Sequence, residues 1–535
     1  MTTESSDTDR AGRGGTDRAF VLGLDGVPWY LVDDWVRDGE LPNFRRLVRE
    51  GAAGPLESTM PPTTALAWPT IATGTWADKH GVYSFQGVRS DYTHEMNTSN
   101  DVERPELWDL VSPAVVANVP MTYPADEIEG KLVTGMMTPD QGEGFTHPPE
   151  LRDEIAEEIP DYRIGLSWEE FRDDPEGFLD EMDSFLDARK RLLRKLMDTD
   201  DWRLFFFVFT APDRLQHLVW DEDVLLDHYR ELDAVLGEVL DYVEDSSANL
   251  YVVSDHGFGP IEGFVHTNTF FEREGFLSRK GGSSRGLLES VGITKDRVRS
   301  VLDATGVDEA TLQERLPDRL VNSVASGIPG SHELFDVDFS ETVAFTHGAG
   351  HLYVNDTERF DDGVVAPERI PEVKAAVRSS LESLPDPDTG EPFLNVADGD
   401  DLFDDDDHSP DLVVRSGGKY LVANGLTDVV FRESYMDAAH RKEGVFFAWG
   451  PSVESGVALE DATVADVAPT VLHGMGDPVP EAADGRVLSE VFARNSAAAD
   501  RPVRERSYAE SGESAAVDDG FDDVEARLQG LGYME

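Results

Sequence analysis

Short runs of apolar residues recur along the chain and predict its strands. Residues 19–24 read AFVLGL, residues 204–209 read LFFFVF and residues 250–253 read LYVV. Continuous apolar runs of this length are typical of parallel strands that are buried on both faces of a sheet. Shorter runs predict further strands at 56–59, 115–119, 132–134, 343–345, 352–354 and 445–449.

Segments with the apolar spacing of helices lie between these runs, at 29–50, 65–72, 179–197, 225–243, 372–384 and 466–472. Strands that alternate with helices predict an α/β fold, with a mostly parallel central sheet flanked by helices. The region after Phe276 changes character, because the Gly-Gly-Ser-Ser loop at 281–284 is followed by a charged helical pattern at 287–320. We expect this region to form an inserted helical or mixed lobe.

The resulting domain organisation has five parts. A polar, Gly-rich tail, which we expect to be disordered, covers residues 1–17. The catalytic core is divided into 18–275 and 336–492 by the insertion at 276–335. Residues 493–535 form a C-terminal extension that is expected to dock on the core, because 524–531 has amphipathic spacing.

Acidic and imidazole side chains stand where predicted strands end. Asp25 follows the first strand, and Asp255 and His256 follow the strand at 250–253. Open α/β sheets bind ligands at the carboxyl ends of their strands, so these side chains suit a metal site. The pair Asp25-Gly26 is equally typical of a simple turn.

The strand at 204–209 leads into the sequence TAPDRLQH. Pro212 suits the first position of a helix, and Asp213 and His217 are four residues apart, so their side chains share one helical face. Such a pair is either a surface contact or half of a metal site. His440 precedes the strand at 445–449, where it is either a surface loop residue or a further ligand.

Thr63 and Thr64 follow Pro61-Pro62 and stand at the start of the helix at 65–72. A hydroxyl there is commonly an N-cap. The same position also suits a nucleophile, because the N–H groups at a helix start stabilise an anion such as phosphate.

The composition of the chain limits its possible partners and metal ligands. The chain has 535 residues, 46 Lys+Arg against 107 Asp+Glu, a net charge of −61, and no cysteine. This acidic surface indicates a halophilic protein and argues against nucleic acid as a partner. Metal ligands must be Asp, Glu or His, which suits zinc or manganese. No apolar run approaches the roughly 20 residues that span a bilayer, and no signal peptide is visible, so we expect a cytoplasmic protein.

Seven polar groups therefore follow strands or open helices, a number that two adjacent divalent cations would need. Two such cations can clamp the attacking and leaving oxygens of a displacement at phosphorus. The seven are Asp25, Thr64, Asp213, His217, Asp255, His256 and His440.

Six motifs in order give a resemblance that covers Phe20 to Leu488: LGLDG, PPTTALAWPTIATGTWADKHGV, TAPDRLQH, SDHGFGP, HRKEGVFFAWGP and DVAPTVLHGMGDPVPEAADGRVL. The chain resembles the type I phosphodiesterase/nucleotide pyrophosphatase branch of the alkaline phosphatase superfamily. The resemblance implies that Thr64 is the nucleophile and forms a phosphothreonine. It implies one metal site of Asp25, Thr64, Asp255 and His256, and a second of Asp213, His217 and His440.

Two departures from the family bear on the substrate, which is expected to be a small phosphate ester. Ala65-Leu66-Ala67 follows Thr64 where nucleotide pyrophosphatases usually have Phe-Pro-Asn. No residue matches the arginine that clamps the phosphate dianion in alkaline phosphatases, which favours diesters. A phosphomonoesterase, a phosphomutase and a non-catalytic metal-binding relative remain alternatives. A sulfatase does not, because the Cys/Ser-x-Pro-x-Arg motif is absent.

Overall fold

The computed structural model describes residues 16–166, 171, 174–280, 334, 336–403, 406, 408–508 and 524. Most of the expected tail at 1–17, most of the expected insertion at 276–335 and most of the chain beyond 508 therefore lie outside the described residues. Within the described part, the α/β class with a mostly parallel central sheet is confirmed.

A ten-stranded sheet forms the centre of the molecule, in the order β20-β2-β19-β9-β1-β8-β5-β6-β7, with β21 paired to β2. Strands β9, β1, β8, β5 and β6 are parallel, whereas β19 runs antiparallel to both of its neighbours. The bounds are β1 (Ala19–Leu24), β2 (Ala52–Glu57), β5 (Ala114–Ala117), β6 (Gly130–Val133), β7 (Thr146–His147), β8 (Leu204–Phe209), β9 (Asn249–Val253), β19 (Glu443–Trp449), β20 (Val457–Ala458) and β21 (Ala462–Thr463).

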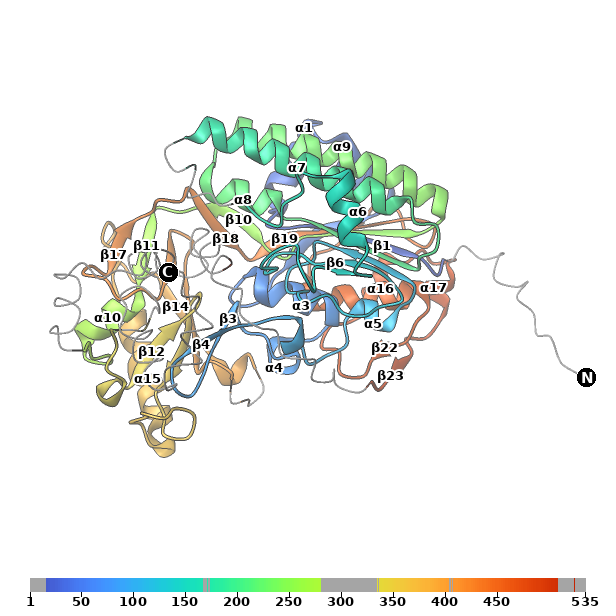
Figure 1. The fold of residues 1–535 in the computed structure, drawn as a ribbon. Coiled ribbons are helices and arrows are strands. Elements are labelled where there is room, and N and C mark those ends of the chain that lie inside the picture. Colours follow the sequence, from blue (N-terminus) through green and yellow to red (C-terminus); the bar gives the residue numbers. More distant parts are fainter. Residues whose placement is uncertain are drawn as a thin grey trace, which may run out of the picture.

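Helices cover both faces of this sheet, which explains why its central strands are apolar at nearly every position. Along β8, the side chains of Phe205, Phe207 and Phe209 join one hydrophobic cluster, and those of Phe206 and Val208 join the cluster on the other face. Figure 1 shows α1, α7 and α9 on one side of the sheet and α3, α5 and α16 on the other. The bounds are α1 (Trp29–Asp38), α2 (Pro42–Glu50), α3 (Thr64–Thr73), α5 (Leu107–Leu110), α7 (Pro175–Met197), α9 (Glu222–Ser246) and α16 (Val467–Met475).

The helix expected at 29–50 is two helices. Gly39 adopts a left-handed conformation with φ of 86° and ends α1. Pro42 then begins α2, because its fixed φ suits the first turn of a helix. The short strand expected at 56–59 is the end of the longer β2, which starts at Ala52.

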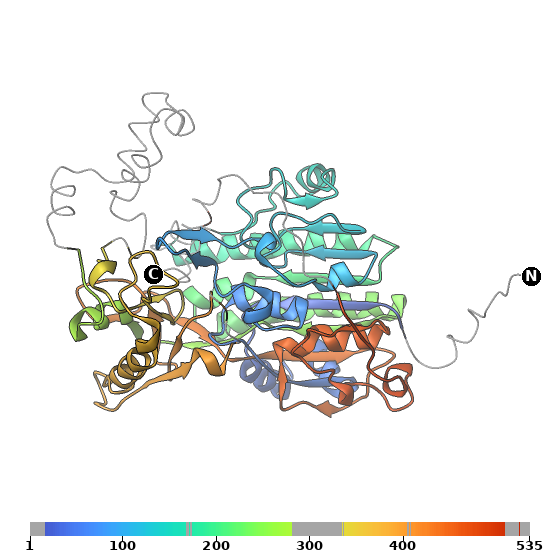
Figure 2. The same cartoon turned by 90° about the horizontal axis from the view of Figure 1, so that it is seen from below.

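A second lobe lies at one end of the sheet, on the left in Figure 2. It has its own hydrophobic cluster, and this cluster includes residues from Val265 to Val430. Residues 336–433, which we expected in the second part of the core, thus pack largely in this lobe. Its elements are β11 (Gly263–His266), α10 (Thr267–Glu274), β12 (Ala344–His347), β13 (His351–Val354), α15 (Ile370–Glu382), β14 (Leu394–Asp398), β15 (Leu412–Ser416), β16 (Tyr420–Ala423) and β17 (Phe431–Glu433).

The described part of the C-terminal extension contacts the core. Strand β23 (Glu505–Arg506) pairs in parallel with β22 (Val479–Pro480), and Val524 is buried in the cluster that contains α7 and α9. Across the described ranges, every helix is too short or too polar to cross a bilayer.

Candidate active site

Two neighbouring parallel strands, β1 and β9, deliver the first group of side chains. Asp25 directly follows β1, and Asp255 and His256 follow β9, the strand beside it. One ligand atom from each of the three lies within 4.8 Å of the others. His256 Nε2 is 3.2 Å from Asp255 Oδ2 and 3.8 Å from Asp25 Oδ1. All three side chains are buried, so this first cluster is closed to bulk water on most sides.

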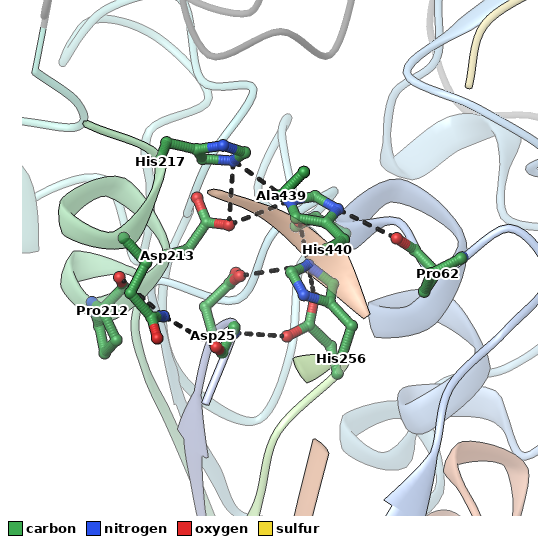
Figure 3. Close-up of polar contacts among 12 residues, drawn as sticks. Asp25, Pro62, Pro212, Asp213, His217, His256, Ala439 and His440 are labelled. Atoms are coloured by element: carbon green, nitrogen blue, oxygen red, sulfur yellow. Dashed lines mark hydrogen bonds and ion pairs between the residues drawn. The ribbon is translucent and has the colours of Figure 1, made fainter. Parts of the chain in front are cut away.

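The second cluster starts from β8, on the other side of β1. Helix α8 (Ala211–Leu218) begins right after β8 and carries Asp213 and His217 on one face, as their spacing predicts. His440 Nε2 lies 3.2 Å from Asp213 Oδ1 and 3.2 Å from His217 Nε2. Figure 3 shows the two imidazoles turned towards Asp213, with Asp25 and His256 beside them. The structure therefore brings His440 to the pair from α8.

His440 lies in a strand of its own and not in a loop. Strand β18 (Ala438–Arg441) pairs antiparallel with β10 (Gly257–Pro260), and His440 stands opposite Phe258. Strand β10 begins immediately after His256, and β19 runs antiparallel to β9, so the start of β19 lies at the carboxyl end of β9. A residue shortly before β19 is thereby placed beside Asp255 and His256.

Thr64 opens α3 and faces the first cluster. Its side chain is fully buried, and its Oγ1 is 3.2 Å from His256 Nε2. Thr63 is the N-cap residue, but its side chain makes no capping hydrogen bond. Of the two neighbouring threonines, Thr64 is therefore the one whose hydroxyl contacts the first cluster.

Hydrogen bonds fix the orientation of two of the imidazoles. The carbonyl oxygen of Gly257 lies 3.1 Å from His256 Nδ1, and that of Pro62 lies 3.0 Å from His440 Nδ1. Because a carbonyl only accepts, each Nδ1 donates its proton, and each Nε2 of the neutral ring presents a lone pair to its cluster. Histidine ligands of metals in proteins are commonly held in this way.

The buried carboxylates of the two clusters need positive charge beside them. Burial raises the pKa of Asp25, and the charges of Asp255 and Asp213 raise it further. Burial likewise raises the pKa of Asp255, with a contribution from Asp213. Burial lowers the pKa values of His256 and His440, so these rings are neutral at pH 7. Three buried carboxylates beside neutral imidazoles are costly without positive charge.

The donor set fits divalent metal ions. A lone pair on His440 Nε2 only 3.2 Å from a carboxylate oxygen is repulsive unless a proton or a cation joins the two atoms. Asp25 Oδ1 is buried and has no hydrogen-bond donor among the described residues. Carboxylate, imidazole and hydroxyl donors without thiolate suit zinc or manganese.

Sequence reasoning missed the residues that support these side chains. Trp68, one turn after Thr64 on α3, donates from Nε1 to Asp25 Oδ2 at 3.0 Å. The backbone N–H of Gly26 donates to Asp255 Oδ1 at 3.1 Å, and that of Val27 donates to Ser254 Oγ at 2.9 Å. These bonds tie the ends of β1 and β9 together. The spacing of Trp68 from Thr64 was the available signal, although an aromatic residue on a buried helix usually indicates core packing.

The chain matches the model of a known protein family. The model of the family described as type I phosphodiesterase/nucleotide pyrophosphatase matches residues 19–441. No curated protein matches the chain. The matched range includes the six residues of the two clusters and Thr64.

One solved structure shows the same fold, and two further structures are similar to the chain. Murine ectonucleotide pyrophosphatase/phosphodiesterase 5 has a TM-score of 0.50 at 12% identity, covering 89% of this chain and 100% of its own. The human protein of the same name has a TM-score of 0.48 at 11% identity, covering 86% of this chain and 96% of its own. An inactive form of the murine protein in complex with AMP has a TM-score of 0.48 at 12% identity, covering 86% and 96%.

Proposed function

Because this chain belongs to the type I phosphodiesterase/nucleotide pyrophosphatase family, a family of metal-dependent hydrolases, we propose that it hydrolyses small phosphate diesters through a covalent intermediate on Thr64. The observation that carries this proposal is the position of Thr64 Oγ1, 3.2 Å from His256 Nε2 and at the N-terminus of α3. A buried hydroxyl in an anion-stabilising position beside metal-ligand chemistry suits nucleophilic attack on phosphorus.

In the first step, Thr64 Oγ1 attacks phosphorus. The bond from Oγ1 to phosphorus forms while the bond from phosphorus to the leaving oxygen breaks, and its electron pair stays on that oxygen. The threonine releases its proton, and the leaving oxygen takes one up from water. In the second step, water attacks the same phosphorus, the Oγ1 bond breaks, and the threonine hydroxyl is restored.

Two divalent cations, zinc or manganese, would stabilise negative charge on the attacking and leaving oxygens when bound. We assign Asp25, Thr64, Asp255 and His256 to one of them and Asp213, His217 and His440 to the other. The Nδ1–H groups of His256 and His440 hold these rings through backbone carbonyls, so their Nε2 atoms stay aimed at the site.

The start of α3 supports the choice of diesters. The backbone N–H groups of Leu66 and Ala67 already donate to the carbonyl of Thr63, and the side chains of residues 65–67 contain no donor. A non-bridging oxygen of the substrate is therefore held only by the backbone at the very start of the helix. A diester at phosphorus carries one negative charge and a monoester close to two. The backbone at the start of α3 carries no full positive charge and binds an anion more weakly than an arginine would. It therefore suits the singly charged diester better than the monoester.

Turnover of bis(4-nitrophenyl) phosphate in concentrated KCl, with added Zn²⁺ or Mn²⁺, tests the proposal. Thr64→Ala should lower the turnover number at least about a thousandfold while the bound metal stays unchanged. Thr73→Ala is the matched control, because Thr73 lies on the same helix and, among the described residues, its side chain bonds only to the carbonyl of Pro69 and to Thr75. Equal turnover in Thr64→Ala and the wild type would remove Thr64 as the nucleophile.

A further inference from the structure

A cavity of about 360 Å³ opens beside the second cluster. It lies between the segment before α3 and the two strands β15 and β16 of the second lobe, and both His217 and His440 line it. Its volume falls within the range of sites that take small molecules. The apolar part of its wall includes Met60, Pro61, Val414, Tyr420, Leu421 and Val422.

Three cationic side chains also line this cavity, and two of them are already engaged. Arg441 donates to the backbone carbonyls of His440, Pro260 and Gly418. Lys442 forms an ion pair with Glu57. The side chains of Arg441 and Lys442 therefore stabilise the fold around β18.

Arg415 is different. This residue of β15 is half-buried, and its guanidinium has neither an ion pair nor a hydrogen bond with any described residue. Its Nε is buried without an acceptor. The chain has 107 acidic residues, so a half-buried guanidinium is expected to have a carboxylate partner nearby. Among the described residues, Arg415 has no such partner.

A second polar group in the cavity also lacks a partner. The Thr63 hydroxyl lines the cavity, its residue is only 8% exposed, and its Oγ1 has no hydrogen bond within the part of the chain that the structure describes. Buried hydroxyls are normally hydrogen-bonded. An unpaired donor and an unpaired cation that line the same cavity point to a ligand with acceptor oxygens.

The position of the cavity indicates which part of a substrate enters it. In an in-line displacement, the leaving oxygen departs on the side of phosphorus opposite the nucleophile. Thr64 contacts the first cluster, whereas the cavity opens over His217 and His440 of the second cluster. The leaving group is therefore directed to this cavity.

We propose that the cavity receives the leaving alcohol and that Arg415 binds an anionic group on it, a carboxylate or a further phosphate. This inference rests on the proposed function and narrows its substrates to phosphate esters whose leaving group is itself anionic and partly apolar. The surrounding negative charge of the protein repels such a group, so a dedicated cation is needed to hold it. Thr63 supplies a neutral hydrogen bond beside it.

Two matched diesters test the assignment: methyl 4-nitrophenyl phosphate, and methyl 3-carboxy-4-nitrophenyl phosphate, which differs by one carboxylate on the leaving phenol. Arg415→Gln should lower kcat/KM for the carboxylated ester by about 10- to 100-fold, the usual loss when a charge-assisted hydrogen bond is removed. It should change kcat/KM for the other ester less than about twofold, and Arg415→Lys should recover part of the loss. Arg432→Gln, an exposed residue of β17 in the same lobe, is the control.

A binding measurement separates this inference from the proposed function. Calorimetry with the leaving phenol itself, 3-carboxy-4-nitrophenol, should show binding to the wild type and at least about tenfold weaker binding to Arg415→Gln. If the wild type hydrolyses neither ester, the proposed function fails, and the calorimetry alone decides the inference. Equal losses for both esters in Arg415→Gln, or no loss for either, or unchanged binding of the phenol, would overturn it.

Discussion

The imidazole rings of His256 and His440 are stacked, with centroids 3.8 Å apart and an angle of 23° between their planes. His256 belongs to the first cluster and His440 to the second, so this contact joins the two. The rings come from separate segments of the chain that meet through the pairing of β10 with β18. The two candidate metal sites are therefore adjacent, and the stacked rings of His256 and His440 lie between them. Because each cluster has its own ligands, a substitution in one cluster should remove the metal ion of that cluster only.

Metal content tests this division. The wild type should bind two divalent ions per chain, and His440→Ala and Asp255→Asn should each retain one, because each removes a ligand of one cluster only. Elemental analysis of protein desalted into metal-free KCl buffer gives the ratio. His408→Ala, an exposed residue of the second lobe, should retain both ions. Two ions in His440→Ala would place this histidine outside the metal site.

The hydrogen bond from Trp68 to Asp25 can be tested by substitution of Trp68. Trp68→Phe removes the donor to Asp25 Oδ2, so metal affinity should fall about 10- to 100-fold, as for other partners of metal ligands. Trp108→Phe is matched, because Trp108 lies in the same hydrophobic cluster and its ring also packs edge-on against Phe206. It should lower stability but leave metal affinity unchanged. Equal affinity losses in both variants, measured by competition with a chelator, would make the role of Trp68 one of packing alone.

Much of this site follows from the sequence. The apolar runs at 19–24, 204–209 and 250–253 are strands, because a sheet that is covered on both faces needs apolar side chains at successive positions. The polar residues at their ends then had to meet at one edge. The helix that carries Asp213 and His217 was predictable from the strand before it and from the proline at its first turn.

The rest depends on tertiary contacts that leave little trace in the sequence. β18 has four residues and mixed polarity, so no pattern marks it as a strand, and the pattern alone left His440 as either a surface loop residue or a ligand. β15 ends in Arg415 and Ser416, and no strand was expected there either. The cavity lies between the core and the second lobe, and local patterns do not encode how two lobes meet.

Acid should destabilise the protein through buried histidines. His80 is fully buried, the N–H of Val82 donates to its Nδ1, and burial lowers its pKa from 6.5 to about 3. The unfolded chain therefore takes up this proton first as pH falls. The contribution of neutral His80 is complete above pH 6.5 and is lost progressively towards pH 3, with a slope of about 1.4 kcal/mol per pH unit.

Denaturant unfolding at several pH values between 7 and about 5 measures that slope. His80→Gln should be less stable at pH 7 but should show a shallower loss of stability with acid, because one titrating group is gone. His408→Gln, which is exposed, should keep the slope of the wild type. A slope in His80→Gln equal to that of the wild type would assign the acid sensitivity to other groups.

Salt should stabilise the fold. A net charge of −61 produces strong self-repulsion, and raising ionic strength from about 0.1 M to 1 M shortens its range from about 10 Å to 3 Å. The melting temperature should therefore rise steadily with KCl. Sucrose at matched water activity is the control, because it favours compact states without screening charge. A melting temperature that is the same in low and high KCl would contradict the halophilic interpretation.

The central claim is that Thr64 carries the covalent intermediate. The most direct test is acid quenching during turnover of bis(4-nitrophenyl) phosphate in concentrated KCl, followed by mass spectrometry of the peptide that contains Thr64. A 4-nitrophenyl phosphate ester is expected on Thr64 in the wild type, and none on any residue in Thr64→Ala. An adduct on a different residue, or continued turnover by Thr64→Ala at the wild-type rate, would contradict it.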